Sequence, residues 1–143
     1  MDEIPTEFWQ GVDQFNQQDF YACHDTLEAI WINAPPADKN FYQGILQIAV
    51  ALYHLSNANW RGAVILMGEG VNRLRAYPAD YGAIDVDALM TSTAMLLKQL
   101  QQLGAEQVGP IAQQVPSGLL QMADGSIVKL PYIQRAAPET LNL

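Results

Sequence analysis

Two side chains one helical turn apart are the clearest candidates for chemistry in this sequence. His24 and Glu28 stand at i and i+4 within the run Phe20–Trp31, so on a helix they share one face, about 5–6 Å apart at Cβ. Side chains in that relation can bind one metal ion together. They can equally form a hydrogen-bonded pair that determines how two helices pack. Because His24 falls within the apolar stripe of this run, the pair is expected to point partly inward.

A metal site needs more than this pair, because a catalytic zinc usually takes three protein ligands and one water. His54 is the expected third ligand, and Asp25 and Gln47 are weaker alternatives. Asp25 lies about a quarter of a turn from the His24 face and is expected to join only with difficulty. The resulting hypothesis is a divalent ion such as zinc on His24, Glu28 and His54, which would lower the pKa of a bound water for hydrolysis.

A narrow polar strip runs along the otherwise apolar stretch 41–55. The strip consists of Gln43, Gln47 and His54. It either faces solvent or faces the His24–Glu28 pair across the interface between two neighbouring helices. In the second arrangement a ligand pocket would form, with Tyr42 beside it. The candidate pocket residues are then His24, Glu28, Trp31, Gln43, Gln47, Tyr53 and His54.

Composition narrows the function classes. The chain has 143 residues, about one domain, and its net charge of −8 argues against binding to nucleic acid or to an anionic membrane surface. The single cysteine, Cys23, excludes an internal disulfide and is expected to be an inert buried thiol. The apolar stretch Ile45–Leu55 is too short to span a bilayer, and the first residues carry no secretion signal. A soluble cytoplasmic protein is therefore expected.

Five helices must position these residues. Apolar spacing together with helix-capping residues predicts helices over about 5–16, 19–33, 38–55, 59–76 and 85–103. The expected N-caps are Asp19, Asp38 and Asn59, and Gly104 is the expected end of the last helix.

The helix predicted over 59–76 carries two further features. Ala63 and Gly70 are small residues on its apolar face and predict close approach to another helix backbone. Glu69 and Arg73 stand at i and i+4 in the favourable order and are expected to form a solvated ion pair.

The predicted architecture is an all-α bundle of about five helices. Phe8-Trp9-Gln10-Gly11 recurs as Phe41-Tyr42-Gln43-Gly44, 33 residues later, which suggests two stacked helical hairpins of tetratricopeptide type plus a fifth helix. Residues 1–104 are assigned to this bundle. Prolines and glycines predict an extended, irregular tail over 105–143 that packs on the bundle, with a short hairpin over 119–130 around Asp124-Gly125.

The motif His24-x3-Glu28-x2-Trp31 also carries a family resemblance. The run from Phe15 to Leu74, about 60 of 143 residues, resembles the bacterial and archaeal family named domain of unknown function 309. The matching features are Asn16, Phe20, the motif itself, Lys39, Gln43-Gly44, Gln47, Tyr53-His54, Asn59 and Gly62. The resemblance implies a small all-helical fold and a functional motif, with metal binding as the suggested role. It implies no established activity.

Three functions are therefore compared. The first is a module that binds a small molecule or a partner protein in a groove near the His24–Glu28 pair. The second is a metal-dependent enzyme of hydrolase type. In the third, the polar cluster only specifies packing and the protein acts by self-association into a homo-oligomer through an apolar face. The candidate face consists of Leu96, Leu97, Leu100 and Leu103.

Overall fold

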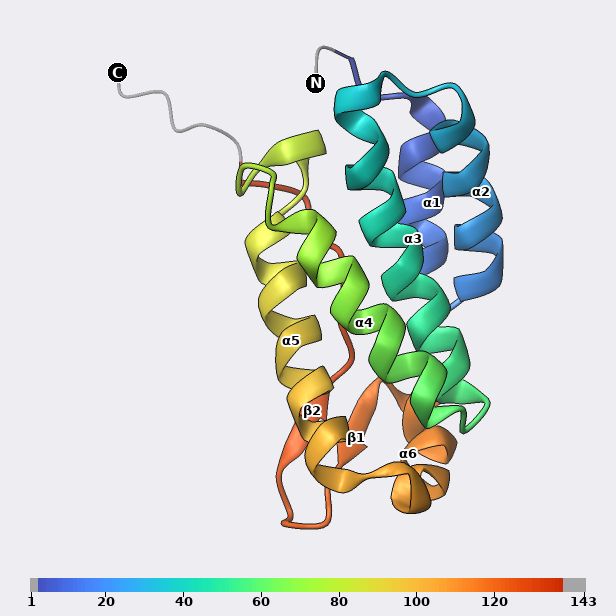
Figure 1. Cartoon of the computed structure of the whole chain (residues 1–143), viewed down its shortest axis with the longest axis vertical. Coiled ribbons are helices and arrows are strands. Elements are labelled where there is room, and N and C mark those ends of the chain that lie inside the picture. The colour runs from blue at the N-terminus through green and yellow to red at the C-terminus, as the bar shows by residue number, and fades with distance from the viewer. Residues whose placement is uncertain (1–2, 138–143) are drawn as a thin grey trace.

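Helices dominate the computed structural model, which describes residues 3–137 and shows six α-helices there (Figure 1). They are α1 (Thr6–Asn16), α2 (Phe20–Ile32), α3 (Pro36–Ser56), α4 (Trp60–Leu74), α5 (Val86–Leu103) and α6 (Val108–Gln114). Three short 3₁₀ turns are η1 (Tyr81–Ala83), η2 (Ala105–Gln107) and η3 (Val115–Ser117). Strands β1 (Leu119–Gln121) and β2 (Ile127–Lys129) pair antiparallel. The predicted all-α class is confirmed, and the likeness to tetratricopeptide units stays a prediction.

Two helices differ from the prediction, one in where it begins and one in being present at all. α3 begins at Pro36 instead of following Asp38, because proline suits the first position of a helix, where its missing N–H costs no hydrogen bond. Asp38 therefore lies inside the first turn and is not the N-cap. α6 lies in the stretch predicted to be irregular. It tolerates Pro110 because this residue falls in its first turn.

α3 is the central helix of the bundle. Its 21 residues pack against α2 on one side and α4 on the other (Figure 1). The backbones of α3 and α4 approach closely, because a Cβ atom at Gly70 would lie 2.8 Å from the carbonyl oxygen of Gly44. The predicted close approach at Gly70 is confirmed. Within residues 3–137, none of the helices combines the length and apolarity that a bilayer crossing requires.

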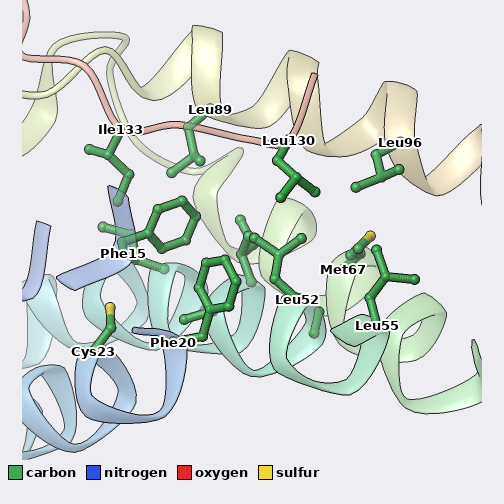
Figure 2. Close-up of a cluster of buried hydrophobic side chains, with 14 of the residues drawn as sticks. Phe15, Phe20, Cys23, Leu52, Leu55, Met67, Leu89, Leu96, Leu130 and Ile133 are labelled. Carbon is green, nitrogen blue, oxygen red and sulfur yellow. The ribbon is translucent and has the colours of Figure 1, made fainter. Parts of the chain in front are cut away.

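The segment after β2 returns along the bundle and closes its core. The Asn16 amide donates to the Ile133 carbonyl at 2.9 Å and accepts from its N–H at 2.8 Å, while Asp85 N–H donates to the Gln134 carbonyl at 2.8 Å. Figure 2 shows Leu130 and Ile133 entering the same buried cluster as Leu89 and Leu96. Residues 138–143 of the predicted tail lie outside the described residues.

This core buries Cys23 and covers the α5 leucines that were considered for self-association. Cys23 is fully buried and free, so the predicted burial of this thiol is confirmed, and burial raises the pKa of the thiol to about 12. Leu96 and Leu100 are also fully buried within the chain. Leu97 and Leu103 are half-buried against the same core. The face of α5 considered for self-association is therefore already covered by the chain itself.

Candidate functional site

Three neighbouring side chains on α2 form what we call the α2 cluster: His24, Asp25 and Glu28. The imidazole lies between the two carboxylates, with Nδ1 3.2 Å from Asp25 Oδ1 and Nε2 3.5 Å from Glu28 Oε2. Asp25 belongs to the cluster because the two ring nitrogens of His24 point in opposite directions. Nδ1 faces Asp25, the next residue, and Nε2 faces Glu28, one helical turn further along. The side chains of Asp25 and Glu28 are 65% and 52% exposed, so the cluster lies on the surface and not within the core.

His54 is not brought to this cluster. Within residues 3–137, the α2 cluster is the one group of three or more His, Cys, Asp or Glu side chains whose metal-ligating atoms all lie within 4.8 Å of one another. His54 instead lies at the turn into α4, where its Nδ1 is 3.2 Å from Asn59 Nδ2. Asn59 Oδ1 accepts from the Gly62 N–H as the predicted N-cap, which orients the amide so that Nδ2 donates to His54. His54 therefore serves the start of α4.

Gln47 of the polar strip takes neither of the two orientations expected for the strip. Gln47 is buried and faces α4, where its Nε2 donates to Glu69 Oε2 and its Oε1 accepts from Arg73 Nε, both at 2.9 Å. Arg73 also donates to Asn40 Oδ1 at 2.6 Å. Glu69 and Arg73 are thus joined through the Gln47 amide, and not as the simple solvated pair that their spacing predicted. Gln43 is half-buried on the same helix.

The aromatic candidates are also separated. Trp31 is half-buried, with Lys39 Nζ 4.3 Å from its ring centroid, and its indole N–H is buried without a partner among the described residues. Tyr53 is 38% exposed and packs on Tyr21, with 5.3 Å between their ring centroids. The predicted pocket around Trp31, Tyr42 and Tyr53 does not form as one unit. Of these three residues, Tyr42 alone lines the cavity described next.

A pocket that the sequence did not suggest opens at one end of the bundle. It has a volume of about 820 Å³ and lies where α1 begins and where α2 connects to α3, at the end where Figure 1 marks the N-terminus. We call it the end pocket. Its walls come from the start of the chain and α1, from α2 and the following connection, from the first turns of α3, and from η1. They are Glu3, Pro5, Glu7, Gln10, Thr26, Ala29, Ile30, Asn33, Ala34, Pro35, Ala37, Asp38, Tyr42 and Tyr81.

One wall of the end pocket is built from a buried acid and tyrosines. Asp38 is only 8% exposed, and its Oδ1 accepts a hydrogen bond from the Tyr81 hydroxyl. The rings of Tyr77 and Tyr81 pack at a tilt of 49° with their centroids 4.6 Å apart, and the Tyr77 hydroxyl donates to the Ala37 carbonyl at 2.7 Å. The Tyr77 oxygen also accepts from the Phe41 N–H at 2.9 Å. Together Asp38, Tyr42, Tyr77 and Tyr81 form what we call the tyrosine–aspartate cluster.

The hydroxyls of this cluster stay protonated at neutral pH. Burial raises the pKa of Tyr42 to about 12, and the nearby Asp38 charge adds to the effect. Burial also raises the pKa of Tyr81, and the hydrogen bond to Asp38 together with the Asp38 charge raises it further. The pKa of Tyr77 is raised chiefly by burial. The wall therefore presents hydroxyl groups together with a buried carboxylate.

Sequence reasoning missed this site for identifiable reasons. Asp38 has the type and place of an N-cap, and Tyr77 followed by Pro78 is typical of a helix end. Asp38 and Tyr81 are 43 residues apart, so no local pattern connects them. The available signal was Tyr77 and Tyr81 at i and i+4 in a segment containing Asp80, which is more aromatic than a connection usually requires.

Comparisons with known proteins cover part of this architecture. Residues 8–66 match the family described as "Domain of unknown function (DUF309)", which confirms the predicted resemblance over that region. The uncharacterized protein YpuF of Bacillus subtilis (strain 168) is 38% identical to this chain over 69 residues. That match spans 48% of this chain and 38% of YpuF, well under two thirds of the relative. The family match includes the α2 cluster, Asp38 and Tyr42, whereas Tyr77 and Tyr81 lie beyond it.

Proposed function

We propose that this protein is a small-molecule-binding module whose ligand occupies the end pocket. The observation that carries the proposal is a cavity of about 820 Å³ with the buried Asp38 carboxylate in its wall. Ligand pockets typically measure about 300–1,000 Å³ and combine apolar walls with a few polar groups. Here Pro5, Ile30 and Pro35 supply apolar wall, while Asp38 and the tyrosines supply the polar groups.

The polar wall is preorganised, which favours binding. Tyr81 holds Asp38 from η1. Tyr77 is not among the lining residues, but it packs against Tyr81 and is itself held by two backbone hydrogen bonds. Because these side chains are already held in place, ligand binding does not include the free-energy cost of ordering them, which otherwise lowers affinity. The pocket is thus ready to take a compact ligand.

A fragment screen with a pocket-filling variant tests this proposal. Ala29 lines the pocket, so Ala29→Trp should fill it and weaken any pocket ligand by at least about tenfold. Ala94→Trp, at an exposed position of α5 outside the pocket lining, is the matched control and should keep wild-type affinity. Protein-observed NMR on both variants reports the site directly. Fragments that bind both variants equally, or that perturb residues away from the end pocket, would contradict the proposal.

A divalent metal ion on the α2 cluster is a second candidate, favoured by the convergence of three donor groups within 4.8 Å. Nε2 of His24 and the Glu28 carboxylate face each other and would be the ligands, with waters completing the shell. Asp25 on Nδ1 would fix the ring, as carboxylates often do for metal-bound histidines. Such an ion could lower the pKa of a bound water and support hydrolysis. The α2 cluster does not line the end pocket, so this candidate is independent of the proposed small-molecule site.

Elemental analysis of untagged protein tests the metal candidate. One ion per chain that disappears in His24→Ala but remains in His54→Ala would support it, because His54 lies outside the cluster. An ion content that His24→Ala leaves unchanged, or no ion in the wild type after incubation with zinc, would contradict it.

Residence in the cytoplasm is part of the same proposal. Cys23 is the only cysteine, and it is free and buried, which agrees with a reducing compartment. Fractionation of cells that produce the protein at native level tests this assignment, and recovery outside the cytoplasmic fraction would overturn it.

A further inference from the structure

Among residues 3–137, the wall of the end pocket carries negative charge and no positive side chain. Its ionisable carboxylates there are Glu3, Glu7 and Asp38, and no described lysine, arginine or histidine lines it. The nearest basic residue in sequence, Lys39, is held elsewhere, since its Nζ lies over Trp31 and donates to the Ile32 carbonyl. The wall therefore favours a positively charged ligand over a neutral or negative one.

Asp38 gives this charge a defined position. The side chain is more than nine-tenths buried, yet it lines the pocket. Within residues 3–137, no lysine or arginine lies within salt-bridge distance of it, and its one hydrogen bond is the Tyr81 hydroxyl on Oδ1. The second oxygen, Oδ2, receives no hydrogen bond from the described residues. Oδ2 is not one of the buried atoms without a partner, so it is open to solvent, and a ligand cation in the pocket could pair with it.

The aromatic rings beside Asp38 suit the same ligand. Tyr42 and Tyr81 both line the pocket. The face of a tyrosine ring attracts a cation, and its hydroxyl oxygen can accept a hydrogen bond. A primary ammonium group offers three donors, enough to reach Asp38 Oδ2 and a tyrosine oxygen at once. The apolar wall at Ile30 and Ala34 would take the uncharged remainder of the molecule.

We infer that the end pocket binds a primary organic amine, with its ammonium group on Asp38 and its apolar body against the α2–α3 connection. This inference rests on the proposed function, because it names the chemical class of the pocket's ligand.

Three probes that share one body and differ in charge test the inference. Phenethylamine is the cation, 2-phenylethanol the neutral analogue and phenylacetate the anion. Titrated by NMR up to about 10 mM, phenethylamine should bind at the end pocket at least about tenfold more tightly than either analogue. If 2-phenylethanol or phenylacetate binds there as well as the amine, the inference fails and the proposed function stands. If no probe binds there, both fail.

Two variants connect the charge preference to the site. Asp38→Asn keeps the side-chain volume and should remove most of the preference for the amine, weakening it at least about tenfold. Glu7→Gln removes an exposed charge from the pocket wall without touching a buried group, and should weaken the amine by about two- to threefold. If Asp38→Asn does not fold, Glu7→Gln still tests whether the charge of the pocket wall contributes to amine binding.

Asp13→Asn is the matched control. It removes the same charge from α1 at an exposed position that does not line the pocket, so the affinity for phenethylamine should stay at the wild-type value. An amine affinity that is unchanged in both Asp38→Asn and Glu7→Gln, or equally weakened in Asp13→Asn, would overturn the inference.

Discussion

The α2 cluster and the tyrosine–aspartate cluster combine acids with ring side chains, yet they differ in burial and in origin. The acids of the α2 cluster are 65% and 52% exposed, whereas Asp38 is 8% exposed. The three residues of the α2 cluster lie within a span of five positions on one helix, whereas Asp38 and Tyr81 are 43 residues apart. The His24-x3-Glu28 motif, the most visible in the sequence, thus lies at the surface, whereas the buried carboxylate of Asp38 belongs to the tyrosine–aspartate cluster.

This difference has an energetic consequence. Exposed ion pairs typically contribute about 0–1 kcal/mol, because water solvates both partners whether or not they meet. A buried polar group that loses its partner costs about 1–3 kcal/mol or more, because no water replaces the lost contact. Changes around the tyrosine–aspartate cluster should therefore affect stability more than changes in the α2 cluster.

The largest effect is expected at Gly82, which positions η1 and hence Tyr81. Gly82 has φ +65°, and a Cβ atom there would lie 2.5 Å from Phe41 Cζ. Gly82→Ala adds backbone strain and displaces a buried ring, so it should lower the free energy of unfolding by about 2–4 kcal/mol. Urea denaturation measures this.

Gly125→Ala is the matched control for Gly82→Ala. Its φ is +87°, but nothing lies within 4 Å of the added atom, so only the strain applies, about 1 kcal/mol. Equal losses in the two variants would show that Phe41 yields freely and that η1 is not tightly positioned.

An alkaline loss of stability should follow from Tyr42. Its pKa rises from 10.0 to about 12 on folding, so its contribution is constant below pH 10 and is lost between pH 10 and about 12, where the unfolded chain ionises first. This loss should reach on the order of 2 kcal/mol by pH 12. Tyr42→Phe should flatten the fall by that amount in urea unfolding at several pH values. An unchanged slope would mean that the Tyr42 hydroxyl is not buried.

A smaller loss of stability is expected at Gln47. Comparing it with Gln43 tests whether a buried, hydrogen-bonded glutamine stabilises the fold more than a half-buried one on the same helix. Gln47→Met keeps the volume but removes the hydrogen bonds to Glu69 and Arg73, so stability should fall by about 1 kcal/mol. Gln43→Met, on the same helix at a half-buried position, should change stability by less than about 0.5 kcal/mol. Equal losses at Gln43 and Gln47 would mean that the Gln47 hydrogen bonds to Glu69 and Arg73 do not stabilise the fold.

The smallest effect is expected in the α2 cluster itself. Asp25→Asn and Glu28→Gln each remove an exposed charge beside His24 and should change the free energy of unfolding by less than about 0.5 kcal/mol in metal-free buffer. A loss above about 1 kcal/mol from either variant would make the cluster a structural element, and the comparison with the tyrosine–aspartate cluster would then break down.

Local features were predicted well from the sequence because their physical causes are local. Apolar spacing located the first five helices, and the predicted cap Asn59 accepts from the Gly62 N–H, whereas Asp19 makes no side-chain capping bond. The short helix α6 was missed, because seven residues with a proline in the first turn leave too little pattern. The start of α3 was placed two residues late, because Asp38 has the type of an N-cap, whereas Pro36 occupies the first position of the helix.

The candidate sites divide in the same way. The sequence by itself determined that His24 and Glu28 share a helix face, because that relation depends only on a spacing of four residues. It could not determine that His54 serves α4, that Gln47 faces Glu69 and Arg73, or that Asp38 meets Tyr81. Tertiary structure decided these, because each depends on how separate helices and turns pack against one another. The end pocket exists only after α1, α2, α3 and η1 have come together.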